Sequence, residues 1–75
     1  MTTAFKKQLL DYAQEDINYA KKQGSIMITD TVYGLLTIEK NGNTYVARNN
    51  QNHMLTGLCM ENDMVEFIAE SYTIG

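Results

Sequence analysis

The sequence predicts one α+β domain with an N-terminal helix, a three-stranded antiparallel sheet that contains an Asn-Gly hairpin, and one or two C-terminal helices. Three observations predict this class. Residues 3–22 repeat apolar side chains at helical spacing, residues 25–47 change to short β-branched and aromatic runs, and residues 63–72 return to the helical period. This order favours an antiparallel sheet that helices cover on one face.

The length and composition are those of one small domain spanning residues 1–75. The chain is 44% apolar and 20% charged, which is ordinary globular usage and disfavours disordered and fibrous classes. Domains of this size rarely exceed about 3–5 kcal/mol of stability without disulfides, metals or oligomerisation. A homodimer is therefore an open alternative.

Several features favour a soluble protein of the cytoplasm. The single Cys59 has no partner for an internal disulfide, whereas secreted domains of this size usually carry several. The N-terminus lacks the apolar stretch of a signal peptide, and no run approaches the ~18 apolar residues of a membrane span. The net charge of −3 and the isoelectric point near 4.8 offer no long-range attraction to phosphate backbones, so direct nucleic-acid binding is not expected.

The first helix is expected over residues 3–22. Thr2 or Thr3 can serve as its N-cap, and Gly24 stands where a glycine ends a helix. One stripe of this helix is apolar, with Phe5, Leu9, Tyr12, Ala13, Ile17 and Ala20 at three- and four-residue spacings.

The middle of the chain is expected to form strands. Residues 26–29 and 31–38 are rich in β-branched and aromatic residues, and Gly34 interrupts the second run, where we predict a bulge. Asn41 and Gly42 separate this run from the next apolar one. An Asn-Gly pair in such a place is the strongest short-range signal of a hairpin with a type I′ turn.

The segment over residues 53–60 fits two structures. Met54, Leu55, Leu58 and Cys59 fit one face of a helix, whereas Gly57 weakens that interpretation. A short helix is expected, with a fourth strand as the alternative.

The closing helix is expected over residues 63–72. Asp63 and Glu66 have the spacing of a capping box in which Asp63 is the cap. One side of this helix is apolar, with Met60, Met64, Phe67, Ile68 and Tyr72, and the opposite side is acidic, with Asp63, Glu66 and Glu70.

The residue types that carry most enzyme chemistry are scarce. The chain has one histidine and one cysteine, His53 and Cys59, whereas nucleophilic catalysis needs an activated nucleophile beside an oriented base. This pair also falls short of the three or four ligands of a zinc site, and no glycine pattern matches a phosphate-binding loop. We therefore expect no enzyme, metal or cofactor, with Cys59 as a small buried hydrophobe and His53 at the surface.

Asp16 falls beside the apolar stripe of the first helix. A buried carboxylate is costly unless it is paired. We therefore expect Asp16 to lie near the rim of the sheet and to accept a hydrogen bond from a tyrosine or a backbone donor.

Carboxylates are the only clustered chemistry. The candidate partner-binding residues are Asp11 and Glu15 on the first helix, and Asp63, Glu66 and Glu70 on the last. A solvated helix face is the alternative explanation. An exposed row of carboxylates also suits the Lys/Arg-rich groove of a nucleic-acid enzyme, and the five tyrosines suit a protein interface.

The hairpin over residues 37–46, followed by an acidic helix that contains Val65-Glu66-Phe67-Ile68, resembles the arrangement in a type II anti-CRISPR protein. Such proteins are small, acidic, phage-encoded inhibitors. The resemblance covers about half of the chain. It implies a stoichiometric inhibitor that occupies a nucleic-acid site of a host nuclease or CRISPR effector complex with carboxylates, in the host cytoplasm. This chain is much less acidic than that inhibitor.

Two hypotheses follow from the sequence. The first is a protein-binding module that inhibits a host nucleic-acid-handling or defence complex. The second is a small regulatory or ligand-binding module that acts as a homodimer.

Overall fold

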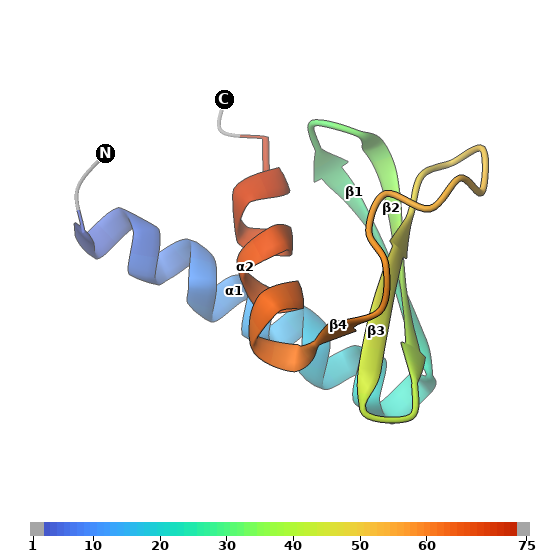
Figure 1. Ribbon diagram of the computed structural model, residues 1–75. Helices are drawn as coiled ribbons and strands as arrows, with labels where there is room; N and C mark the ends of the chain where they lie inside the picture. The colour runs from blue at the N-terminus through green and yellow to red at the C-terminus, as the bar shows by residue number, and fades with distance from the viewer. Residues whose placement is uncertain (1–2, 74–75) are drawn as a thin grey trace.

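The computed structural model describes residues 3–73 as two helices on one face of a sheet. The elements are α1 (Thr3–Gln23), β1 (Ser25–Thr31), β2 (Gly34–Asn41), β3 (Thr44–Arg48), β4 (Cys59–Met60) and α2 (Glu61–Ser71). The strands form one antiparallel sheet in the order β1-β2-β3-β4. Both helices lie on the same side of it, with α2 crossing α1 (Figure 1). The predicted α+β class is confirmed, and the sheet has four strands instead of three.

The helix α1 follows the predicted pattern. Ala13, Ile17 and Ala20 are fully buried. Gly24 ends the helix with φ at 92°, and its N–H donates to the Ala20 carbonyl at 2.7 Å, which is how a glycine satisfies a terminal helix carbonyl. The expected cap at Thr2 or Thr3 and the Phe5 side chain lie outside what the structure describes.

The run predicted as one strand over residues 31–38 is divided by a turn. Val32 and Tyr33 form the turn, and Gly34 begins β2 with φ at 76°. The hydroxyl of Thr31 closes the turn, because Oγ1 donates to the Gly34 carbonyl at 2.7 Å and accepts from the Tyr33 N–H at 3.2 Å. The predicted bulge at Gly34 is wrong, since the register shift lies within β1, between Ile28 and Thr31.

The hairpin between β2 and β3 is confirmed, but its turn lies one residue later than predicted. Asn41 pairs with Thr44, so the two central residues are Gly42 and Asn43. Only Gly42 has a positive φ, at 63°. The predicted type I′ turn needs a positive φ at both central residues, which this turn does not have. Glycine at the first central position alone is the requirement of a type II′ turn. Thr44 Oγ1 donates to the Asn41 carbonyl at 2.7 Å.

The short helix expected over residues 53–60 is wrong, and the alternative of a fourth strand is correct. The segment runs back along β3. Leu55 N–H donates to the Ala47 carbonyl at 2.7 Å, and Ala47 N–H donates to Thr56 Oγ1 at 3.1 Å. Beyond Gly57 the chain pairs with β3 as β4. The backbone groups of β3 need partners on this side, and that requirement decides between the two structures.

The helix α2 begins two residues before the predicted cap at Asp63. Its N-cap is Met60, which makes no side-chain capping hydrogen bond. Because β4 leads directly into the helix, Asp63 falls within the first turn, where a carboxylate favours the positive end of the helix dipole. The helix ends at Ser71, and Tyr72 is extended.

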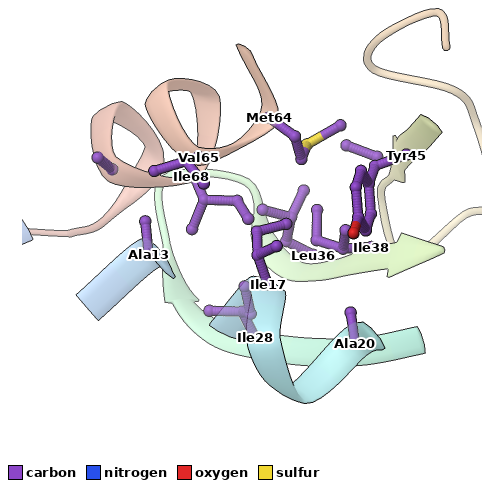
Figure 2. Close-up of a cluster of buried hydrophobic side chains, with 12 residues drawn as sticks. Ala13, Ile17, Ala20, Ile28, Leu36, Ile38, Tyr45, Met64, Val65 and Ile68 are labelled. Carbon is purple, nitrogen blue, oxygen red and sulfur yellow. The ribbon is translucent and has the colours of Figure 1, made fainter. Parts of the chain in front are cut away.

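The core lies where α1, α2 and the sheet meet (Figure 2). Its largest fully buried side chains are Tyr45, Ile17, Leu36, Ile38, Met64 and Ile68. Truncating one such aliphatic side chain to alanine typically costs about 2–5 kcal/mol. Met60 was expected on the apolar side of α2, but it is 59% exposed.

Candidate functional site

The outward side of α2 presents a continuous row of carboxylates. Asp63, Glu66 and Glu70 are exposed and lie opposite the buried Met64 and Ile68, as their spacing requires. We call these three residues the acidic row. The helix carries no lysine or arginine, and within residues 3–73 none of the three carboxylates has a hydrogen bond or an ion pair.

An aromatic pair flanks the acidic row. Phe67 lies one turn from both Asp63 and Glu70 on α2, and its ring stacks on Tyr33 with centroids 5.7 Å apart and 13° between the planes. The turn before β2 is held against the end of α2, because Val32 N–H donates to the Ser71 carbonyl at 2.8 Å.

The side chains of the turn remain open to solvent, since Val32 is 66% and Tyr33 is 43% exposed. We call Val32, Tyr33 and Phe67 the aromatic corner. The sequence predictions missed it, because they placed Val32 and Tyr33 within a strand and Phe67 on the apolar side of the last helix. Gly34 was the only signal of the turn that exposes them.

The acids of α1 form a separate surface. Asp11 and Glu15 are exposed and point away from the core, on the side of the helix opposite Ile17. The same helix carries four lysines: Lys6, Lys7, Lys21 and Lys22. No hydrogen bond or ion pair among the described residues joins Asp11 or Glu15 to the acidic row. The five candidate residues therefore lie on two helices, and only α2 lacks lysine and arginine.

Asp16 accepts a hydrogen bond from a tyrosine, as the sequence predicts, and this bond joins the residue after α2 to α1. Tyr72 Oη donates to Asp16 Oδ2 at 2.5 Å. Burial raises the pKa of the Asp16 carboxyl, the Tyr72 hydrogen bond opposes this shift, and the charge of Glu15 adds to it. The same burial and the hydrogen bond to Asp16 raise the pKa of Tyr72. Asp16 thus holds the two helices together and does not belong to the acidic row.

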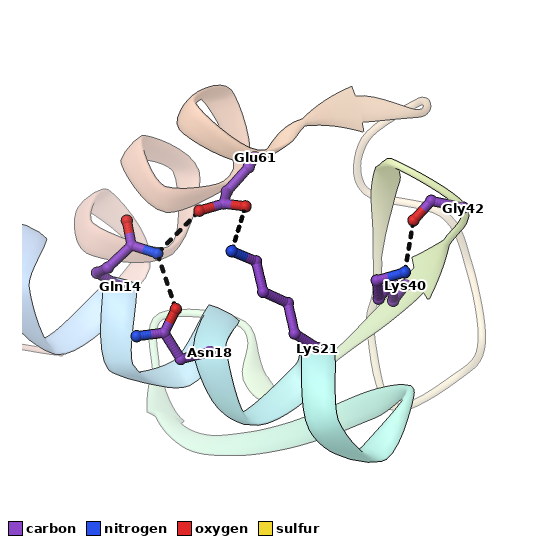
Figure 3. A network of polar contacts seen from close by, with 6 residues as sticks. All are labelled: Gln14, Asn18, Lys21, Lys40, Gly42 and Glu61. Carbon is purple, nitrogen blue, oxygen red and sulfur yellow. Dashed lines mark hydrogen bonds and ion pairs between the residues drawn. The ribbon is translucent and has the colours of Figure 1, made fainter.

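The start of α2 is tied to α1 by a second carboxylate (Figure 3). Glu61 pairs with Lys21 at 2.7 Å and accepts a hydrogen bond from Gln14 Nε2 at 3.0 Å. Gln14 Nε2 also donates to Asn18 Oδ1 at 3.2 Å. The hydrogen bonds from Lys21 and Gln14 lower the pKa of Glu61. Unlike the carboxylates of the acidic row, Glu61 has a partner within the chain for each of its two oxygens.

The two residues weighed for catalysis lie in ordinary environments. His53 is exposed, as expected. Cys59 is half-buried against the core, and its Sγ donates to the Gly57 carbonyl at 3.4 Å, so it is less buried than predicted. Across residues 3–73, no three His, Cys, Asp or Glu side chains converge on a point that a metal ion could occupy. Neither helix combines the length and the apolar character needed to span a membrane, within the part of the chain described.

Comparisons with known proteins do not assign a family to the chain. No family model matches it, and neither the curated proteins nor the solved structures contain a match. The acidic row and the aromatic corner are therefore interpreted from their own geometry.

Proposed function

We propose that this chain is a protein-binding module, not an enzyme, and that it inhibits a host nucleic-acid-handling or defence complex one to one. The observation that carries the proposal is the acidic row, in which three aligned carboxylates have no cation on their helix and no partner among the described residues. Such a row suits the Lys/Arg-rich groove in which a nucleic-acid enzyme holds a phosphate backbone. The resemblance to a type II anti-CRISPR protein supports a CRISPR effector nuclease in the host cytoplasm as the partner.

The aromatic corner supports the same proposal. Exposed ion pairs contribute only about 0.2–1 kcal/mol each, whereas large side chains that become buried at the centre of an interface carry most of its energy. Tyr33 and Phe67 are stacked before any partner arrives, so little conformational entropy is lost when a partner covers them. Water displaced from this corner would also strengthen the neighbouring charge pairs. The carboxylates then steer the encounter, and the corner prolongs the complex.

The proposal is tested by titrating a guide-loaded CRISPR effector nuclease with the purified chain and measuring DNA cleavage. We expect cleavage to fall linearly and to end near one equivalent, with weaker inhibition at higher ionic strength because exposed charges are screened. A wild-type chain that forms no complex and leaves cleavage unchanged contradicts the proposal.

Two matched variants locate the surface. Asp63→Asn/Glu66→Gln/Glu70→Gln removes the charge of the acidic row while keeping side-chain size, and we expect it to abolish inhibition. Asp11→Asn/Glu15→Gln removes charge from α1, and we expect inhibition to stay within about threefold of wild type, as for charges outside an interface. Equal losses from both variants would contradict the assignment to α2.

A further inference from the structure

The strand β1 has one open edge. It is the first strand of the sheet, so among residues 3–73 only β2 pairs with it along its length. Lys40 N–H donates to the Gly24 carbonyl at 2.9 Å, and the antiparallel register continues from there through Ile26 opposite Ile38. Hydrogen bonding alternates along an antiparallel pair. The backbone N–H and C=O groups of Ser25 and Met27 therefore point away from β2, toward the open edge.

The far end of this edge already accepts an added strand from within the molecule. Thr31 and Tyr72 form an antiparallel bridge, and Thr73 N–H donates to the Asp30 carbonyl at 2.9 Å. The segment after α2 thus covers the last residues of β1. The first five residues, 25–29, continue the same edge and have no added strand among residues 3–73.

A groove runs along this free part of β1, between the strand and α1. It consists of two hollows of about 490 and 560 Å³ that meet at Met27. Tyr12 and Tyr19, which line it from α1, are half-exposed. The charged side chains among the residues that line the two hollows are Asp16 and Asp30. The groove therefore complements a cation.

Tyr12 and Asp16 are spaced along α1 much like alternate side chains of an extended chain, and Tyr19 follows somewhat closer. Tyr12, Asp16 and Tyr19 lie on successive turns, about 6 and 4.5 Å apart along the helix axis at 1.5 Å per residue. Alternate side chains on one face of a strand are about 6.6 Å apart. Asp16 uses Oδ2 for Tyr72, and Oδ1 has no hydrogen bond within the described residues, which leaves it able to accept from a central basic side chain.

We propose that this groove binds an extended segment of another protein, which pairs with β1 as an additional strand. The segment carries Lys or Arg at its centre, facing Asp16, with an apolar residue two positions away on each side, facing Tyr12 and Tyr19. Main-chain hydrogen bonds to Ser25 and Met27 supply affinity, and the alternate side chains supply specificity. This surface is separate from the acidic row and does not depend on the function proposed above.

The test uses a display library of random heptapeptides as the probe and three immobilised chains: wild type, Met27→Pro and Asp16→Asn. Proline is tolerated where an edge-strand N–H faces solvent, so Met27→Pro removes an outward donor without breaking the pairing with β2. Circular dichroism confirms that each variant is folded. If Met27→Pro is not, Met27 is instead replaced by its backbone-ester analogue, α-hydroxymethionine, which removes the same donor.

We expect peptides enriched by wild type to carry a basic residue between two apolar ones, and to lose at least tenfold in enrichment on Met27→Pro. On Asp16→Asn the basic residue should lose its preference while the apolar positions persist. Three outcomes would overturn the proposal: equal enrichment on wild type and the edge variant, enriched peptides without a basic centre, or sedimentation showing a wild-type dimer that the edge variant turns into a monomer. The last would assign the edge to a second copy of this chain.

Discussion

The two helices both expose carboxylates, yet they balance them differently. On α1, Asp11 and Glu15 share the helix with four lysines. On α2, the three carboxylates of the acidic row have no lysine or arginine on their own helix, and Glu70 lies near the negative end of the helix dipole, where a carboxylate is unfavourable.

Like charges one turn apart also destabilise a helix by about 0.2–0.5 kcal/mol per pair. The acidic row therefore weakens the helix that carries it. Asp11 and Glu15 are also one turn apart, but α1 carries four lysines, whereas α2 carries no lysine or arginine that could offset the repulsion. This difference is why we place the proposed binding surface on α2 and not on α1.

The largest expected effect comes from equal charge changes placed on the two helices. Glu66→Lys/Glu70→Lys and Asp11→Lys/Glu15→Lys each change the net charge by the same amount, so the average field of the molecule is the same. We expect the first to weaken binding to the effector nuclease by at least about 100-fold, or about 2.7 kcal/mol. The second should weaken it less than about fivefold, as for a charge outside the interface. Calorimetry measures both, and equal losses would show that net charge matters and not the row.

The fold of α1 could be predicted because its signals are local. Ala13, Ile17 and Ala20 repeat at the helical period. Gly24 ends the helix with a positive φ, a conformation that favours glycine. The start of α2 could not be predicted in this way. The spacing of Asp63 and Glu66 is also a local signal, but a long-range pairing of strands decides where the helix begins. The pairing of β4 with β3 fixes the chain as far as Met60, and the helix then begins at once.

The candidate site divides in the same way. Periodicity alone aligns Asp63, Glu66 and Glu70 on the outside of α2. The contact of Tyr33 with Phe67 joins a turn and a helix that are distant in sequence, and no periodic pattern encodes such a contact. The buried partner of Asp16 was predictable as a type, because a carboxylate on an apolar stripe needs a donor, but its identity as Tyr72 depends on how the chain leaves α2.

The next effect tests whether the aromatic corner belongs to the surface of α2. Tyr33→Ala removes the ring stacked on Phe67, which we expect to cost about 1 kcal/mol of folding free energy and about tenfold in binding to the nuclease. Tyr19→Ala, a matched change on the exposed side of α1, should leave that binding unchanged. Chemical denaturation and calorimetry separate the two quantities. Unchanged nuclease binding by Tyr33→Ala would limit the site to the carboxylates.

The two engaged carboxylates should respond to pH in opposite directions. The folded state raises the pKa of Asp16, so its contribution to stability is fully present below the ordinary carboxyl pKa and is lost as the pH rises through the raised value. The folded state lowers the pKa of Glu61, so its contribution is present above the ordinary pKa and is lost as the pH falls through the lowered value.

Unfolding curves from about pH 3 to 7, which span the ordinary carboxyl pKa, measure both effects. Asp16→Asn should gain stability relative to wild type as the pH rises, because it removes the charge that burial disfavours. Glu61→Gln should lose stability relative to wild type over the same rise. Parallel curves for wild type and either variant would show that the corresponding carboxylate is not coupled to folding.

The smallest effect addresses the cost of the acidic row directly. Glu70→Gln relieves the repulsion from Glu66 and removes a negative charge from the last turn, so we expect stability to rise by about 0.3–0.5 kcal/mol. Glu15→Gln on α1 also relieves a repulsion, since Asp11 lies one turn away, but Glu15 is not in the last turn of its helix, so we expect a smaller gain. If Glu70→Gln is more stable than wild type and yet binds the nuclease less tightly, Glu70 belongs to the binding surface. A residue that served only folding would not lower the stability of the folded chain. If Glu70→Gln lowers the stability, then the row contributes to the fold, and the contrast between the two helices has been interpreted in the wrong direction.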